Sequence, residues 1–275
     1  MSLPYFRTQA ESGAQTPYIV HLLLDAAVPV EREALLEGWR TRLGRVEPVD
    51  EGESGALHVA LPEYLSGGGV PLQLAVMALE GIGVEELAAC LRQSWTWDGA
   101  APVAAQCRAS LTLSDFHGGG VDRRIRLAVF HGAVATMLGL LPVRAVQWLP
   151  SQQVLEPGAY LQRLAEGEGL RGSALNVRRF RMKAEDGEPV QVMDTLGLGA
   201  FGLPDLQVRF RGIDTARATD WLYGQAARLF DEGERFVFAQ GVPAAEGSGI
   251  WRFHPEDSAA APERRVLEVT TEAVQ

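Results

Sequence analysis

The sequence predicts an α+β protein built from two similar halves packed into one compact body. Short apolar runs of strand length alternate with helical stretches, and glycine-rich or Asp-Gly turns join neighbouring strands. Each half has the element order β-α-β-β-α-β, which is the split-βαβ pattern of ferredoxin-like domains. We therefore expect an irregular arm over residues 1–17, a first α+β half over 18–120 and a second over 121–275.

The composition of the chain excludes several classes of protein. Hydrophobic residues make up 47% of the 275 residues and charged residues 22%, which excludes a disordered, fibrous or low-complexity chain. The 35 acidic residues outnumber the 25 basic residues and give a formal net charge of −10. An acidic chain repels phosphate backbones and anionic membrane surfaces. The expected partner is therefore another protein, rather than nucleic acid or a membrane.

The first half begins with a βα unit. The apolar run 18–24 is typical of a short buried strand. The stretch 31–43 predicts a helix, because Leu36, Trp39 and Leu43 fall on one of its faces.

The rest of the first half contains three strands and a second helix. Strands over 56–61 and 71–79 flank the glycine loop 67–69, and this short separation predicts an antiparallel pair. Apolar residues at helical spacing predict a helix over 84–95, and alternation predicts a strand over 107–113.

The helix predicted over 121–141 is expected to be the most buried helix of the chain. It is apolar on two faces, and Asp122 is well placed to cap its N-terminus. His131 lies within this helix and has no Cys, Asp or Glu three or four residues later that could complete a ligand pair. We expect it to be a hydrogen-bonded histidine of the core.

The second half continues with alternating strands and helices. Pro157 is typical of a first helical position, Asp186-Gly187 indicates a turn, and Asp214 is a helix cap. The expected elements are strands over 143–149, 175–182, 189–195, 206–210, 249–253 and 265–270, with helices after 157 and over 214–232.

The cysteines and the N-terminus indicate a cytoplasmic protein. Cys90 and Cys107 are too few for a disulfide framework and fit no metal-binding spacing, so we expect both to be reduced and buried. Residues 1–17 lack the basic start and apolar centre of a signal peptide, and the apolar run that follows is only of strand length.

Several motifs of the second half resemble a known family. The segments MDTLG (193–197) and GLPDLQ (202–207) are similar to the signature of a bacterial family catalogued as domain of unknown function 4261. WRFHPEDS (251–258), with Pro262-Glu263-Arg264 after it, resembles the C-terminal end of that family domain. AVQW (145–148) resembles the segment that leads into the domain. The resemblance implies an intracellular bacterial protein, and it supplies no catalytic residues because the family has no assigned activity.

The loop between the MDTLG and GLPDLQ motifs is a candidate binding element. Glycines and a proline interrupt any regular structure between Asp194 and the strand that begins at Leu206. Irregular backbone held between two strands often carries binding residues. The candidate binding loop consists of Gly197, Gly199, Gly202, Leu203, Pro204, Asp205 and Gln207.

Five residues are candidates for catalysis, and two interpretations of them remain open. Asp194 and Asp205 flank the loop, while His254, Glu256 and Asp257 form a second polar group. Brought together, these side chains could hold a divalent cation or act as an acid and base. Alternatively, the two aspartates accept backbone N–H bonds from the glycine-rich turns. An accessible Asp205 favours binding, and a buried Asp205 favours the structural role.

The function predicted from the sequence is that of a non-catalytic interaction or regulatory protein without a cofactor. No Walker A, HExxH or GxSxG motif occurs in the chain. A toxin-neutralising or effector-associated role fits such a protein. The alternative is a metal-assisted hydrolase that uses the five candidate residues. The tryptophans bear on this choice: core packing is the simplest interpretation of all of them, whereas one or two exposed tryptophans would indicate a protein-binding surface. They are Trp95, Trp97, Trp148, Trp221 and Trp251.

Overall fold

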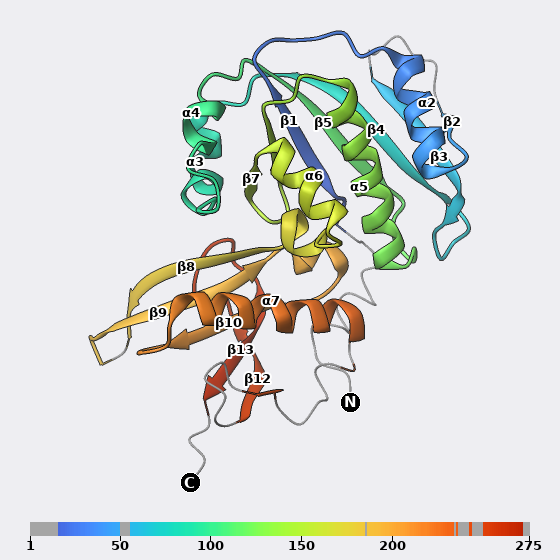
Figure 1. Cartoon of the computed structure of the whole chain (residues 1–275). Coiled ribbons are helices and arrows are strands. Elements are labelled where there is room, and N and C mark those ends of the chain that lie inside the picture. Colours follow the sequence, from blue (N-terminus) through green and yellow to red (C-terminus); the bar gives the residue numbers. More distant parts are fainter. Residues whose placement is uncertain are drawn as a thin grey trace. The chain divides into compact units, whose positions relative to one another are not determined.

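The computed structural model confirms an α+β protein with two sheets (Figure 1). It describes residues 16–49, 56–184, 186–233, 235, 242–243 and 250–271. The predicted arm over 1–17 therefore lies almost entirely outside the described residues. The chain divides into two compact units, of which one spans Gln15–Ala174 and the other contains Leu175–Gln275. Each unit is described by itself.

The first unit contains a seven-stranded sheet in which all neighbouring strands are antiparallel. The spatial order of the strands is β2-β3-β4-β5-β1-β6-β7. Their bounds are β1 Ile19–Leu24, β2 Glu47–Pro48, β3 Leu57–Leu65, β4 Pro71–Glu80, β5 Ala109–Phe116, β6 Ala145–Trp148 and β7 Gln153–Leu155.

The strand order differs from the predicted ferredoxin-like pattern. β4 and β5 lie between β3 and β1, so β1 and β3 run in opposite directions and form no split βαβ unit. β6, which the sequence assigned to the half over 121–275, pairs with β1, and Val20 lies opposite Trp148. The boundary between the units therefore falls near residue 174 rather than residue 120.

Three helices cover one face of this sheet: α2 (Arg32–Leu43), α5 (Arg123–Leu140) and α6 (Pro157–Ala165) (Figure 1). On the other face, α3 (Val84–Arg92) and α4 (Ala100–Ala104) pack over the part of the sheet that contains Leu23, Ala145 and Val154. A short π-helical turn, Leu170–Ala174, ends the unit. Cys90 and Cys107 are buried free thiols, as predicted.

Helix α5 has more buried residues than any other described helix, which confirms the prediction for 121–141. Asp122 caps it by accepting hydrogen bonds from the backbone N–H groups of Arg124 and Ile125. His131 is buried within it and is hydrogen-bonded to the Tyr160 hydroxyl and the Gly169 carbonyl, as expected for a core histidine.

The second unit contains a six-stranded sheet with the order β11-β12-β13-β10-β9-β8. β10 and β13 are parallel, and all other neighbours are antiparallel. The helix α7 (Thr215–Glu232), capped by Asp214, packs on one face, where Trp221 contacts Trp251 and Phe253. The strands are β8 Asn176–Lys183, β9 Pro189–Leu196, β10 Asp205–Phe210, β11 Val242–Pro243, β12 Ile250–Asp257 and β13 Arg265–Thr271.

Among the described residues, none of the helices has the length and apolar character needed to cross a membrane.

Shortening a core side chain of α5 should destabilise the protein strongly. Met137 is fully buried, so Met137→Ala should lower the free energy of unfolding by about 2–5 kcal/mol through lost burial and a residual cavity. Leu140, an exposed residue of the same helix, is the control, and Leu140→Ala should change stability by less than about 0.5 kcal/mol. Urea unfolding of both variants checks this; equal losses would contradict the packing of α5.

His131 should make the protein sensitive to acid. Burial lowers the pKa of His131 from 6.5 to about 3, while the Gly169 carbonyl opposes this shift. Between these values the unfolded chain binds a proton that the folded chain does not, so stability falls as pH drops below about 6.5, by at most about 1.4 kcal/mol per pH unit. The His131→Gln variant should lack this component when urea unfolding is compared at pH 7, 6 and 5. Parallel pH profiles of the two proteins would contradict the assignment.

Candidate functional site

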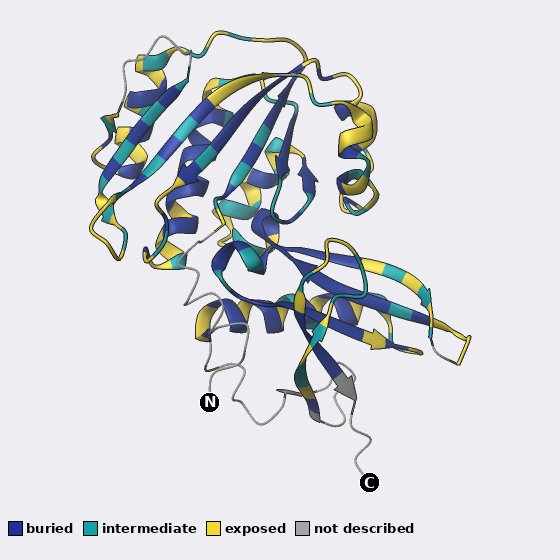
Figure 2. Cartoon of the chain, turned by 180° about the vertical axis from the view of Figure 1, so that it is seen from behind, coloured by how far each residue is buried: buried dark blue, intermediate teal, exposed yellow. Residues whose placement is uncertain are grey.

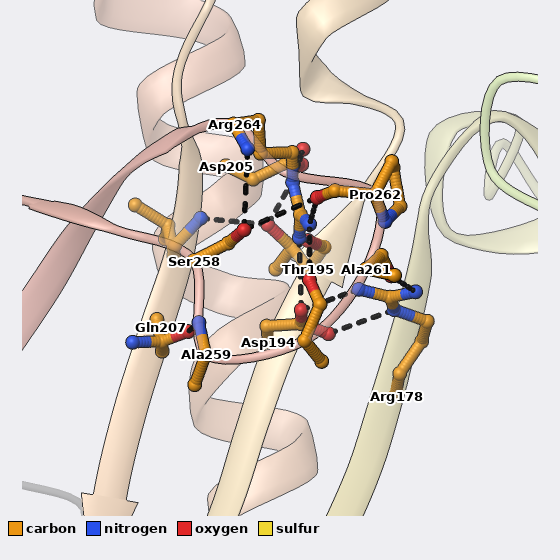
Figure 3. Close-up of polar contacts among 12 residues, drawn as sticks. Arg178, Asp194, Thr195, Asp205, Gln207, Ser258, Ala259, Ala261, Pro262 and Arg264 are labelled. Atoms are coloured by element: carbon orange, nitrogen blue, oxygen red, sulfur yellow. Dashed lines mark hydrogen bonds and ion pairs between the residues drawn. The ribbon is translucent and has the colours of Figure 1, made fainter.

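The predicted aspartates lie in a network of buried ion pairs in the second unit (Figure 3). Asp194 on β9 lies directly opposite Arg178 on β8, so the two side chains share one face of the sheet. They form a two-pronged pair, with Nε–Oδ1 at 2.9 Å and Nη2–Oδ2 at 2.6 Å. Both side chains are almost fully buried, and this geometry is the strongest that an arginine and a carboxylate form.

Arg264 joins the two aspartates of the network. Its Nη2 donates to Asp194 Oδ2 at 2.8 Å, and its Nε donates to Asp205 Oδ2 at 2.9 Å. Nη2 also donates to the backbone carbonyl of Thr195. Two guanidinium groups thus neutralise two carboxylates in a region with little access to water, which is the condition under which buried charges are tolerated.

Asp205 also closes the glycine-rich loop. Its Oδ1 accepts hydrogen bonds from the backbone N–H of Leu198 and the hydroxyl of Thr195, each at 3.1 Å. The loop contains a 3-10 turn over Leu198–Phe201, flanked by Gly197 at φ 128° and Gly202 at φ 72°. Side-chain-bearing residues rarely adopt such positive φ values, so these two glycines fit the turn.

A second loop covers the network. It connects β12 to β13, and Arg178 Nη1 donates to the carbonyl of Ala261 within it. Gln207 on β10 accepts a hydrogen bond from the backbone N–H of Ala259 at 2.7 Å and donates to Glu268 on β13 at 2.9 Å. The network therefore fixes both the glycine-rich loop and the β12–β13 loop.

The pKa values in the network reflect competition between burial and pairing. Burial raises the pKa of Asp205 to about 6, while the Arg264 guanidinium and the backbone N–H of Leu198 act in the opposite direction. Burial alone would lower the pKa of Arg264, but the carboxylates of Asp205 and Asp194 outweigh it and raise that pKa. Asp205 is therefore mostly ionised at neutral pH, and Arg264 carries its full charge.

The structure brings together only two of the five candidate catalytic residues, Asp194 and Asp205. Asp205 is 3% exposed, which matches the structural alternative for this residue rather than a position at an accessible rim. On β12, His254 lies opposite Glu268 in the strand register, and Asp257 is exposed and paired with Arg265. In the part of the chain that the structure describes, no group of three or more His, Cys, Asp or Glu side chains is arranged to hold a metal ion.

The predicted binding loop is largely buried. Gly199, in the 3-10 turn, and Gly202, which follows it, are both partly accessible. Leu203, Pro204 and Gln207 are buried. The polar groups of Gln207 are directed to Glu268 and to the β12–β13 loop, as described above.

Sequence reasoning missed Arg178 and Arg264, the partners of the aspartates. Arg264 stands in the Pro262-Glu263-Arg264 segment, but it is separated from Asp205 by 59 residues. The alternation of β8 could have identified Arg178. It lies two residues after Asn176, so the two side chains are on the same face of the sheet.

A second candidate site is the part of the first sheet that no described helix covers, which we call the open face. It consists of the side chains of β4 and β5 that point away from α2 and α5, and Figure 2 shows this side of the sheet. Three large apolar side chains on it are exposed, Met77 by 47%, Leu79 by 44% and Phe116 by 43%. Its residues are Gln73, Ala75, Met77, Leu79, Ser110, Thr112, Ser114 and Phe116. None of them is charged, and Ser110 and Thr112 are buried.

Two histidines on the neighbouring strands border the open face. His21 on β1 is opposite Thr112 and is hydrogen-bonded to its hydroxyl at 2.7 Å, and burial lowers the pKa of His21, so the ring is neutral at pH 7. His58 on β3 is hydrogen-bonded to Gln73 and packs against Phe116 edge to face. Trp95, which follows α3 on this side of the sheet, is 51% exposed.

Comparison with known families identifies the C-terminal part of the chain. Residues 194–270 match the family model described as Domain of unknown function (DUF4261). The predicted resemblance is thereby confirmed from Asp194 on β9 to Thr270 on β13, and the segment upstream of residue 194 lies outside the match. A search of the curated proteins and a search of the solved structures give no match.

Removing Arg264 should unfold or strongly destabilise the second unit. In Arg264→Ala, the buried carboxylates of Asp194 and Asp205 lose a shared cation, which should cost about 3–5 kcal/mol. The adjacent Arg265 is the control, because its pair with Asp257 is exposed and Arg265→Ala should cost less than about 1 kcal/mol. Thermal and urea unfolding distinguish the two, and similar losses would show that the network does not hold the unit together.

Proposed function

We propose that this chain is a cytoplasmic bacterial protein that binds another protein, without catalysis, through the open face of the first sheet. The observation that carries the proposal is the composition of that face. Met77, Leu79 and Phe116 are exposed together, and no charged side chain separates them. Protein interfaces are depleted of charge at their centres and enriched in methionine and aromatic residues.

The absence of charged side chains from the open face supports the proposal, because solvent-facing sheet surfaces normally carry such side chains. Charged side chains on an exposed sheet face keep a protein soluble and prevent association. This chain has a formal net charge of −10, so acidic residues are abundant elsewhere. An uncharged apolar face on such a protein has a physical cost unless a partner covers it.

The partner we propose is a protein with an apolar surface bordered by basic side chains. Glu85 and Glu86 are exposed at the start of α3, which follows β4 on the chain, and the net charge of the whole chain is negative. The negative electrostatic field of this chain would attract basic side chains at the rim of the partner's surface. This attraction would raise the association rate.

The predicted aspartates support a binding protein over the alternative hydrolase. Each carboxylate oxygen of Asp194 and Asp205 already accepts a hydrogen bond from an arginine, a hydroxyl or a backbone N–H group. A catalytic role would require these bonds to break. We therefore assign the matched motifs to the scaffold and the binding function to the open face.

The proposal is tested by crosslinking at the open face in cells. A photoreactive p-benzoylphenylalanine at position 77 should capture a partner protein, whereas the same group at Leu140, which is equally exposed, should not. The captured protein is then purified, and its affinity for the unmodified chain is measured by calorimetry. Met77→Asp and Phe116→Asp should each weaken binding at least tenfold without changing the melting temperature, and Leu140→Asp should leave affinity unchanged.

Three results would contradict the proposal. The first is an equal crosslinking pattern at positions 77 and 140. The second is a purified complex whose affinity is unaffected by Met77→Asp. The third is capture of a second copy of this chain alone, which would make the open face a surface for self-association.

A further inference from the structure

The strands of the open face are already paired on both sides. β4 pairs with β3 and with β5, and β5 also pairs with β1. A partner strand therefore cannot add to this part of the sheet, because strand addition needs an unpaired edge. Contact at the open face is made by side chains, and the partner has to satisfy its own backbone hydrogen bonds.

Small side chains separate the large ones on the open face. Phe116 lies opposite Gln73, and Met77 lies four residues further along β4. Between them, Ala75 lies opposite Ser114, and both of these small residues are partly exposed. A helix that lies along the strands can approach the sheet most closely over this pair, with longer side chains reaching Phe116 in one direction and Met77 in the other.

The width of the exposed apolar region fits one helix. Its side chains stand on two neighbouring strands about 4.8 Å apart, and an α-helix with its side chains is about 10 Å across. On the same side of the sheet, α3 and α4 pack over the part that contains Leu23, Ala145 and Val154. One more helix beside them would extend this layer over β4 and β5. On the other side, α2 and α5 run along the strands in this manner (Figure 1).

Exposed acidic residues lie near one end of this region. Leu79 and Leu23 both lie opposite Ser110, so α3, which packs over Leu23, is near the Leu79 end. Glu85 and Glu86 are exposed in the first turn of α3. Basic side chains at the corresponding end of a docked helix would be attracted to them.

We infer that the open face binds an amphipathic α-helix of the partner protein, which lies along β4 and β5. The apolar residues of this helix contact Phe116, Met77 and Leu79, as in other helices that are recognised through apolar residues at i, i+3, i+4 and i+7. Its basic residues lie near Glu85 and Glu86. This docking mode rests on the proposed function of the open face and specifies the form of the recognised segment.

The spacing of crosslinks distinguishes a helix from an extended segment. Leu79 lies six residues beyond the position opposite Phe116, which is about 20 Å along the strands. A helix covers this distance in about 13 residues and an extended segment in about six. Separate full-length chains with p-benzoylphenylalanine at position 79 or 116 should therefore crosslink in cells to one segment of the same partner, at sites about 13 residues apart.

A second measurement uses defined peptides and the purified full chain. Two end-blocked peptides contain equal numbers of Leu and Lys, one at helical spacing and the other in strict alternation, so they differ only in the period of the apolar residues. By calorimetry, the helical peptide should bind at least tenfold more tightly. Met77→Ser and Phe116→Ser should each weaken its binding at least fivefold, whereas Leu140→Ser, which shortens an exposed side chain of α5, should have no effect.

The position of the basic residues is tested by association rates. Glu85→Gln/Glu86→Gln should lower the association rate of the helical peptide at least threefold at low ionic strength. Glu33→Gln/Glu37→Gln, which neutralises two exposed acidic residues of α2, is the matched control and should have a smaller effect. Equal effects of the two double variants would contradict the placement of the basic residues near α3.

The remaining outcomes separate helix docking from the proposed function. Crosslinks about six residues apart, or in separate segments of one partner, would exclude a helix and leave the open face as a binding surface. Equal affinities of the two peptides, or unchanged binding to Met77→Ser, would also exclude helix docking. Capture of no partner beyond those found at Leu140 would contradict the proposed function and the docking mode together. Crosslinks to a second copy of this chain alone would assign the face to self-association.

Discussion

The second unit depends on the pairing of two buried carboxylates with two arginines. Asp194 forms ion pairs with both Arg178 and Arg264, and Arg264 also forms an ion pair with Asp205. Buried ions lose the hydration energy of water, and their pairing offsets this cost only when the geometry is complete. The loops that supply Asp205 and Arg264 therefore have to occupy these positions for the sheet to be stable. This explains why a glycine-rich turn and the β12–β13 loop are fixed together.

The position of the network gives a physical account of the motifs that match the family model. The model begins at Asp194 and includes Asp205, Gln207 and Arg264, all of which make the contacts that close the two loops. These contacts hold the two loops in place whatever the protein binds. The surfaces that recognise partners can then differ among proteins that share the motif. A match to these residues accordingly carries information about structure and little about activity.

Local signals in the sequence predicted most helices and strands, whereas long-range pairing was not predictable. The caps Asp122 and Asp214 and the apolar faces of α5 depend on residues within a few positions of one another. The order of the first sheet depends on β1 pairing with both β5 and β6, which element order does not determine. The burial of Asp205 likewise depends on Arg264, which is distant in the sequence. Sequence patterns therefore identified the aspartates of the site and offered a structural role for them, but they did not identify the arginine partners.

Binding at the open face should respond weakly to salt because it relies chiefly on the burial of apolar surface. Burial of Met77, Leu79 and Phe116 removes apolar area from water, and this contribution is not screened by ions. Ions at physiological strength screen exposed charges beyond about 8 Å, so added salt should slow the approach of a basic partner to the open face while leaving most of its affinity. An affinity that persists at high salt would therefore identify apolar burial, rather than attraction between charges, as the main source of binding.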